Sequence, residues 1–370
     1  MAVRTPRIVS VCFAALLAAG CSSDDPDPED GVEDDGADGA DGADGGEDDG
    51  GDNTGGGTGG DGTWTVAWGP ITVEPGEEDT RCIKKRLPTD APVRIGQIVN
   101  ELGDASHHMI VYRLAGDEEE VLEPEPCQPF VDVLDPSQGA PLAVTQKADE
   151  IIQLPAGVAF SLEAEQMIRI ELHFVNASDE PIELSASSTF VEVPDDEFEH
   201  EADFLFVGNP DISIEPTEDP PNDVATTLPT PFLPLPPELA GINIFAVTGH
   251  EHQWGTGVSA SITTGEEDEG TVIYAPEDFQ WDEPETFYHD PPMTMPEGGG
   301  FRFSCSWKNF SDETVGFGES VDDEMCFFWA YYYPSQGAQI CFHTDQLGGN
   351  DLCCPDNPLC EYIDDWLNMQ

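Results

Sequence analysis

Residues 167–175 read MIRIELHFV, a short run in which apolar residues alternate with other side chains and a histidine, His173, stands near the end. Runs of this kind are typical of β-strands, and Gly, Pro, Asn and Asp separate them along the chain. Helical periodicity is scarce. Frequent short strands with turn residues between them favour antiparallel sandwiches over alternating βαβ units. The other runs are 92–99, 109–113, 182–193, 242–247, 258–263, 271–275 and 325–333.

The strand-rich part of the chain is long enough for two domains. We predict an all-β protein with β-rich domains at 63–198 and 199–349 and a Cys-rich tail at 350–370. The acidic, Pro-rich segment 192–204 is the favoured boundary. The segment EPTEDPPNDVATTLPTPFLPLPPE, residues 215–238, is expected to be a long loop because Pro removes the backbone donors of a strand.

The first 21 residues have the layout of a secretory signal, with Arg4 and Arg7, then an apolar run, then small residues. The ending LAAGC resembles a bacterial lipobox, in which Cys21 would carry the lipid. An ordinary cleaved signal with an incidental Cys21 is the alternative. We therefore predict a lipid-anchored protein of the cell envelope, with the outer membrane favoured because Ser22 gives no reason for inner-membrane retention.

Residues 22–62 consist mostly of Asp, Gly, Glu, Ala and Thr, with no aromatic residue and no Lys or Arg. Such a segment is expected to be a disordered tether, because it has no apolar surface and its charges repel one another. The whole chain carries 76 Asp and Glu against 12 Lys and Arg. This charge excludes nucleic acid as a partner.

Five of the eight histidines lie in three motifs, SHHMIVYR at 106–113, the run at 167–175, and GHEHQWG at 249–255. Adjacent histidines on a regular strand face opposite ways, so His107 and His108 share an ion only if the backbone turns there or they use different ring nitrogens. His250 and His252 would leave one face of a strand together, with Glu251 pointing to solvent. Taken singly, each motif also fits surface or core histidines.

The motifs HHM, LHF, HxHxxG and EMC with YYYP resemble, in this order, the copper type II, ascorbate-dependent monooxygenases. That family includes peptidylglycine alpha-hydroxylating monooxygenase and dopamine beta-monooxygenase, and the resemblance runs from about Gly76 to about Pro334. It implies two jelly-roll-like sandwiches and two copper ions. It also implies hydroxylation of a substrate C–H bond with O2 and ascorbate or another one-electron reductant. The implied ligands are His107, His108 and His173 for the electron-donating copper, and His250, His252 and Met325 for the oxygen-activating copper, which should open to a cleft between domains.

Departures from the family concern the substrate. Thr248 stands where the peptide-hydroxylating branch has an Arg that grips a carboxylate. Phe327, Trp329 and Tyr331 replace polar substrate-binding residues and share one strand face. They predict either an aromatic wall for a small apolar or aromatic substrate, or core packing. Asp323 and Glu324 are read as solvated surface, or else as partners of the Met325 loop.

Cysteine usage favours disulfides, because the chain is predicted to be exported. The resemblance implies that Cys305 pairs with Cys326, and Cys82 and Cys127 bracket the His pair. Two disulfides are favoured over a zinc cluster for the tail, with their pairing left open. The tail cysteines are Cys341, Cys353, Cys354 and Cys360.

The remaining histidines, His200, His289 and His343, are interpreted as surface residues. Three function classes stay open. The favoured one is a copper monooxygenase. The others are a copper-binding or electron-transfer protein without turnover, and a surface-displayed sandwich whose histidines are relics.

Overall fold

The computed structural model describes residues 62–116, 118–129, 139–218, 223–345, 350–355, 357 and 360. Strands dominate these residues, and their one helical element is the short 3-10 turn η1 (Pro237–Leu239). The prediction of an all-β fold is confirmed. No helix within these ranges is long and apolar enough to cross a membrane. The predicted signal, the lipidation site Cys21 and residues 22–61 of the predicted tether lie outside the described residues.

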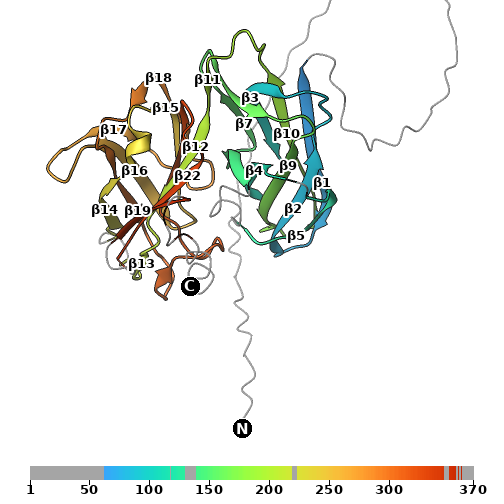
Figure 1. Ribbon diagram of the computed structural model, residues 1–370. Coiled ribbons are helices and arrows are strands. Elements are labelled where there is room, and N and C mark those ends of the chain that lie inside the picture. The colour runs from blue at the N-terminus through green and yellow to red at the C-terminus, as the bar shows by residue number, and fades with distance from the viewer. Residues whose placement is uncertain are drawn as a thin grey trace, which may run out of the picture. The chain divides into compact units, whose positions relative to one another are not determined.

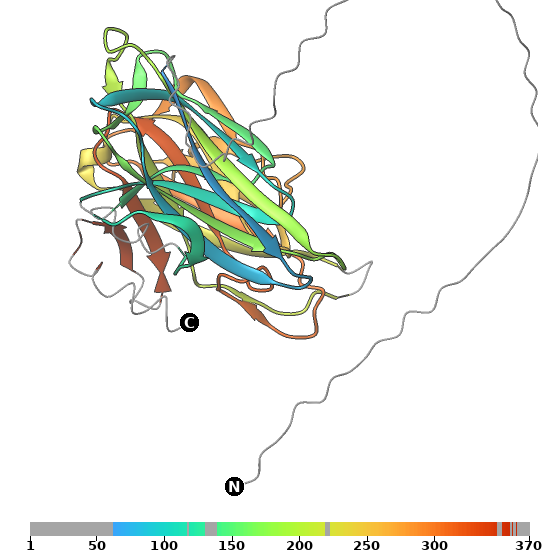
Figure 2. The same cartoon turned by 90° about the vertical axis from the view of Figure 1, so that its right-hand side faces the viewer.

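The first half contains a six-stranded and a five-stranded sheet (Figures 1 and 2). Trp68 and Phe174, one from each sheet, pack edge to face with ring centroids 6.2 Å apart in the core. The first sheet consists of β1 (Thr63–Val73), β10 (Ile182–Glu192), β3 (Val93–Leu102), β8 (Val158–Leu162) and β11 (His200–Glu201), with β7 (Asp149–Gln153) beside β3. The second consists of β5 (Val121–Pro126), β2 (Glu78–Arg86), β9 (Met167–Val175), β4 (Ser106–Leu114) and β6 (Gly139–Thr145).

The second half contains a six-stranded, a four-stranded and a two-stranded sheet. Phe328 and Phe301 connect the two larger sheets in a second core, with ring centroids 5.1 Å apart. The six-stranded sheet has β18 (Phe287–Thr294), β15 (Asn243–His250), β21 (Phe327–Tyr333), β12 (Asp203–Gly208), β22 (Gln339–Thr344) and β23 (Asn350–Cys354). The others have β14 (Thr226–Pro234), β19 (Gly300–Trp307), β16 (Gly255–Thr263) and β17 (Thr271–Tyr274), and β13 (Ser213–Ile214) with β20 (Val315–Gly316).

The chain changes sheets within the segment 192–204. β11 pairs in parallel with β8 of the first half, whereas β12, which starts two residues after β11 ends, pairs with β21 and β22 of the second half. At the other end, β23 pairs with β22, so that residues 350–354 extend the six-stranded sheet.

Strand β14 corrects the expectation of a loop over 215–238. It pairs with β19 and lies at the edge of its sheet, and it contains Pro229, Pro231 and Pro234. Pro is tolerated on an edge strand because its missing N–H can face away from the neighbouring strand. The pairing also shifts register between Thr230 and Leu233. The prolines of this segment are therefore compatible with an edge strand and do not indicate a loop.

Four disulfides join the eight cysteines after Cys21. Cys82–Cys127 and the predicted pair Cys305–Cys326 are both present, the second linking β19 to the residue before β21. The tail pairing left open by the sequence is Cys341–Cys353 and Cys354–Cys360, as expected for disulfides rather than a zinc cluster.

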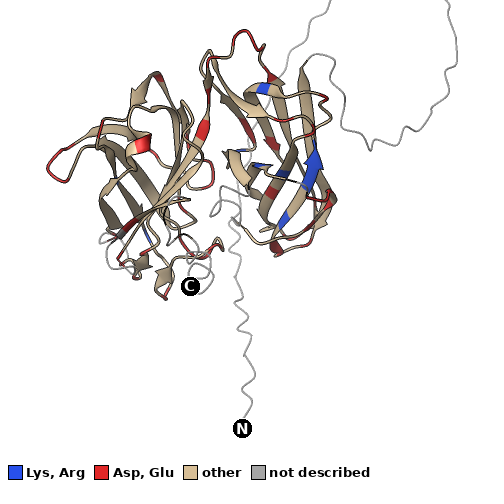
Figure 3. Cartoon of the chain, in the orientation of Figure 1, with Lys and Arg blue, Asp and Glu red and all other residues tan. Residues whose placement is uncertain are grey.

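Acidic residues spread over both halves, whereas Lys and Arg gather mainly on the first half (Figure 3). Strand β2 alone contains four basic residues. After residue 198 the sequence contains only two basic residues, Arg302 and Lys308. The negative charge is therefore strongest in the second half.

Candidate metal centre

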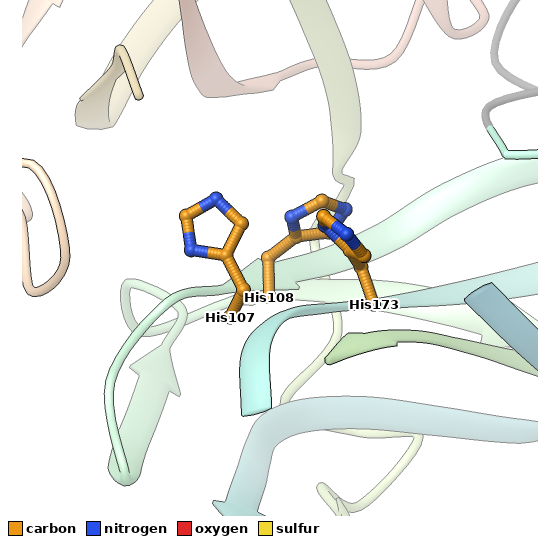
Figure 4. A group of neighbouring side chains, drawn as sticks. All are labelled: His107, His108 and His173. Atoms are coloured by element: carbon orange, nitrogen blue, oxygen red, sulfur yellow. The ribbon is translucent and has the colours of Figure 1, made fainter. Parts of the chain in front are cut away.

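Three histidines of the five-stranded sheet face one another (Figure 4). His108 on β4 lies opposite His173 on β9. The pairing of these strands shifts register between Ser106 and His108, which inserts His107 as an extra residue. This irregularity is the backbone turn that adjacent histidines need to share an ion. One ring nitrogen from each of the three side chains lies within 4.8 Å of the others.

The three imidazoles are buried, and burial favours their neutral form. Burial lowers the pKa of His107 and of His108 well below the ordinary value, and the neighbouring histidines lower both further. Burial also lowers the pKa of His173, although the Glu78 carboxylate acts in the opposite direction. Neutral imidazoles keep a lone pair for a metal, so the trio presents three nitrogen donors without a proton to displace.

Glu78 on β2 determines which nitrogen of His173 is available. Its Oε1 lies 3.1 Å from His173 Nε2, which leaves Nδ1 for a ligand. The same carboxylate oxygen accepts a hydrogen bond of 3.2 Å from the backbone N–H of Val321, in the loop before Met325. Glu78 therefore connects His173 of the first candidate site to the loop that precedes Met325 of the second.

The HxH motif forms where β15 ends. His250 is the last residue of the strand, the chain turns at residues 253–254, and the rings of His250 and His252 are 5.0 Å apart. His250 Nδ1 is hydrogen bonded to Oε1 of Gln146, and His252 Nδ1 lies 3.2 Å from the carbonyl oxygen of Asp323. The Nε2 atoms of both are buried and have no hydrogen-bond partner among the described residues. Orphaned nitrogens of this kind, with the other nitrogen fixed by a protein acceptor, are typical of metal-ligating histidines.

The two predicted sites form one cluster of five imidazoles. The ring centroid of His107 is 5.4 Å from that of His252 and 6.1 Å from that of His250, compared with 5.3 Å to His173 in its own trio. His108 lies 6.0 Å from His250. All five side chains are buried. Residues of both halves, among them Gln146 and Trp281, contact this cluster, and the opening of the second site to a cleft stays a prediction.

Met325 lies in the loop before β21 and is buried. Its backbone N–H and that of His252 both donate to Oε2 of Glu324, at 3.2 and 2.9 Å. One carboxylate oxygen thus holds the backbone of two of the three predicted ligands of the second site.

Glu251 and Glu324 are both fully buried, which corrects the expectation of solvated carboxylates and, for Glu324, agrees with the alternative of a partner of the Met325 loop. Glu251 accepts hydrogen bonds from the backbone N–H groups of Gly257 and Ser306, at 3.0 and 2.9 Å, where the pairing of β16 with β19 is irregular. Burial and then Glu324 raise its pKa well above the ordinary value. Burial raises the pKa of Glu324 to about 7. These carboxylates satisfy backbone donors that the irregular strand end leaves unpaired.

The proposed aromatic wall is packed in the core. Phe327, Trp329 and Tyr331 belong to the same buried cluster as the first half, whereas the alternate residues of β21 face the second core. The backbone N–H of Val144 on β6 donates to the Tyr331 hydroxyl at 3.2 Å, and the Trp329 ring is 6.2 Å from that of His250. The core-packing alternative therefore describes this structure.

Thr248 is buried on β15, two residues before His250. Its hydroxyl lies 2.9 Å from that of Thr286, which in turn donates to Glu150 of the first half at 2.7 Å. Sequence reasoning missed the partner residues Gln146 and Glu78 and also Trp281, whose ring lies 5.7 Å from that of His107. No motif or spacing marks them, because each contacts the histidines only through the fold.

The other histidines have partners away from the cluster. His289 Nε2 lies 3.0 Å from the carbonyl oxygen of Ile273, and His343 Nδ1 lies 2.8 Å from Asp351. His200 is exposed and stacks on Tyr333.

Comparison with known proteins places a family match in the second half. Residues 209–348 match the model of the copper type II ascorbate-dependent monooxygenase C-terminal domain, a copper-dependent family. This span includes His250, His252 and Met325, whereas the first trio precedes it. No curated protein matches the chain.

Among solved structures, the chain is similar to the major capsid protein P2 from bacteriophage PM2, with 10% identity, 74% of this chain and 99% of that chain covered, and a TM-score of 0.33. The STIV MCP gives 9% identity, 74% and 97% coverage and the same TM-score. Likenesses this weak bear on neither the site nor the function.

Proposed function

We propose that this protein is a copper-dependent monooxygenase that hydroxylates a C–H bond of a small apolar or aromatic substrate. It would use O2 and a one-electron reductant such as ascorbate. The observation that carries the proposal is the convergence of five buried imidazoles from three distant motifs. Two of these imidazoles, His250 and His252, lie inside the segment that matches the copper monooxygenase domain.

The residues present fit copper. Imidazole suits both oxidation states of copper, and a thioether favours the reduced state. The buried Nε2 atoms of His250 and His252 have no hydrogen-bond partner among the described residues, so their lone pairs can serve as metal ligands. In the proposal, His107, His108 and His173 hold one ion, and His250, His252 and Met325 hold the other. When bound, the first copper would supply electrons and the second would activate O2.

The surrounding residues orient and shield these donors. Gln146, the Asp323 carbonyl and Glu78 each bind one ring nitrogen of a histidine and leave the other available. Trp281 packs beside His107, and Trp329 beside His250. The apolar walls exclude water from the imidazoles, which limits the loss of electrons and reactive oxygen to solvent.

We propose the substrate class from the face of Phe327, Trp329 and Tyr331, which is packed against the first half in this structure and would contact a substrate only when the two halves separate. A face of three aromatic rings, with Thr248 rather than a cation nearby, suits an apolar or aromatic molecule. Each of the three side chains is at most 3% exposed, so substrate entry requires the two halves to separate locally. We further propose that a lipid on Cys21 anchors the protein in the cell envelope, in the outer membrane.

The alternative is a copper-binding or electron-transfer protein without turnover. The burial of Phe327, Trp329 and Tyr331 favours this alternative. A substrate would need an exposed face to bind, and these three side chains are covered in the structure.

Copper content and product formation test the proposal. The full chain, loaded with copper and desalted, should bind about two copper ions. It should also consume O2 in an ascorbate-dependent reaction that yields a hydroxylated product from a panel of aromatic and aliphatic substrates. Copper binding without any product would support the alternative, and a copper content near zero would contradict both.

Met325→Ala tests the assigned second site. The variant should keep most of the copper, because all five imidazole donors remain, and lose turnover. Met293→Ala, on β18 and outside the proposed ligands, serves as the control and should keep turnover. Full activity of Met325→Ala would remove Met325 from the site.

A further inference from the structure

Gln146 belongs to the first half but binds a histidine of the second. It follows directly after β6 and is only 5% exposed. Its Oε1 is hydrogen bonded to His250 Nδ1. It also lies outside residues 209–348, the span that matches the copper monooxygenase domain.

The two ends of the Gln146 amide are used unequally. The oxygen is bonded to His250, whereas the nitrogen, Nε2, is buried and has no hydrogen-bond partner among the described residues. A glutamine kept only for packing would satisfy both ends, since an unpaired buried donor costs free energy. The unequal use indicates a side chain placed for its contact with His250.

The contact determines the tautomer of His250. A neutral imidazole has one N–H, and an amide oxygen can only accept it, so Nδ1 carries the proton and Nε2 keeps its lone pair. The Nε2 atom is the one without a protein partner. An acceptor on the second nitrogen is how proteins orient a metal-ligating histidine.

We propose that Gln146 is a positioning residue of the second metal site, supplied by the first half, and that it holds His250 in the Nδ1–H tautomer with Nε2 presented to the metal. The site would then be complete only when both halves contribute. This inference rests on the proposed function for the identity of the metal, although the tautomer itself can be measured without any metal.

Nitrogen-15 NMR of the metal-free full chain at pH 8 provides the test, because imidazole is neutral at that pH. The His250 ring of the wild type should show a protonated Nδ1. Gln146→Glu keeps an acceptor and should keep this tautomer, whereas Gln146→Met removes the acceptor at similar length and should shift the population towards Nε2–H. Gln253→Met is the matched control. Gln253 lies in the loop that contains His252, but its side chain donates to Asp322 and not to a histidine.

Copper titration gives the second readout. Gln146→Met should weaken the second copper by about 10–100-fold and change its Cu(II) EPR signal, while the first copper and the Gln253→Met variant stay at wild-type values. An Nε2–H tautomer in the wild type, or an unchanged tautomer and copper affinity in Gln146→Met, would overturn the inference.

The inference and the proposed function fail in different ways. A chain that binds no copper but needs Gln146 for the Nδ1–H tautomer would contradict the copper enzyme and support the positioning role. A working hydroxylase in which Gln146→Met leaves the His250 tautomer unchanged would do the reverse.

Discussion

Single side chains in this protein decide which ring nitrogens are free. Three histidines each have one ring nitrogen hydrogen bonded to a protein acceptor. The acceptor is Glu78 for His173, Gln146 for His250 and the Asp323 carbonyl for His252. The result differs between sites, because His173 is left with Nδ1 and the other two with Nε2. An imidazole can thus be a ligand through either end, and the partner chooses the end.

Glu324 is the residue whose replacement should cost the most around the second site. Its two oxygens accept hydrogen bonds from the backbone N–H groups of His252, Trp254 and Met325 and from the Trp307 indole. In Glu324→Gln an amide –NH2 faces some of these donors. We expect a loss of about 1–3 kcal/mol in the free energy of unfolding, measured with urea at pH 8, since at least one buried donor loses its acceptor.

Glu313→Gln, at an exposed position of the same half, is the control for that loss and should unfold like the wild type. Equal stability of the Glu324→Gln variant would show that the four hydrogen bonds contribute nothing net.

At the scale of elements, β12 and β21 depend on a glycine. Gly208 pairs with Phe327, and a Cβ at Gly208 would lie 1.9 Å from the Phe327 ring, which stacks on Phe206 at 5.0 Å. Gly208→Ala should therefore displace Phe327 and destabilise the chain by about 1–3 kcal/mol, measured by urea unfolding. Gly257→Ala on β16 is the control, because no atom lies within 4 Å of its added Cβ.

The disulfide Cys305–Cys326 should stabilise the second site more than the tail disulfide does. It spans 21 residues and ends next to Met325, whereas Cys354–Cys360 spans 6. Removing a disulfide commonly costs about 2–5 kcal/mol, and more for the longer loop. We expect the double serine variant of the first pair to unfold at lower temperature and to lose the second copper before the first. An equal effect of the tail variant would contradict this order.

Strand periodicity predicted eight of the 23 strands among the described residues, namely β3, β4, β9, β10, β15, β16, β17 and β21. It failed at β14, because proline was taken as a loop residue where an edge strand tolerates it. It also failed for Glu251 and Glu324. Both carboxylates are buried against backbone donors, and alternation along a strand does not report what an irregular strand end leaves unpaired.

The whole molecule brings five histidines together from positions up to 145 residues apart, between His107 and His252. The sequence, through family resemblance, indicated which residues share a site. It did not indicate that both sites would be adjacent, because that depends on how β6, β15 and the loop before β21 meet. Gln146 and Trp281 were invisible for the same reason.

Copper should stabilise the folded chain, because a metal that binds the native state and not the unfolded state shifts the equilibrium by mass action. At pH 7, loading should raise the unfolding temperature in proportion to the logarithm of free copper, and EDTA should return it to the metal-free value. Calorimetry with and without copper measures the difference. An unfolding temperature that does not respond to copper would exclude a site formed by folding.

The metal-free protein should lose stability as the pH falls, and His252 shows the sign. Burial lowers its pKa to about 4. Between pH 6.5 and 4 the His252 imidazole is therefore protonated in the unfolded chain and neutral in the folded chain. Its contribution is complete above pH 6.5 and is lost as the pH falls towards 4. From pH 7 to pH 5 this one histidine should account for about 2 kcal/mol of lost stability.

The same sign applies to His107, His108 and His250, whereas Glu251 and Glu324, with raised pKa values, oppose it. The comparison that isolates His252 is therefore the slope of unfolding free energy against pH in His252→Gln and in the control His200→Gln. The His252→Gln slope should be shallower by about 2 kcal/mol over those two pH units, because only that variant lacks the proton that the folded chain refuses. Equal slopes would mean that the His252 imidazole is protonated in the fold at pH 5, which a buried cluster of neutral imidazoles does not allow.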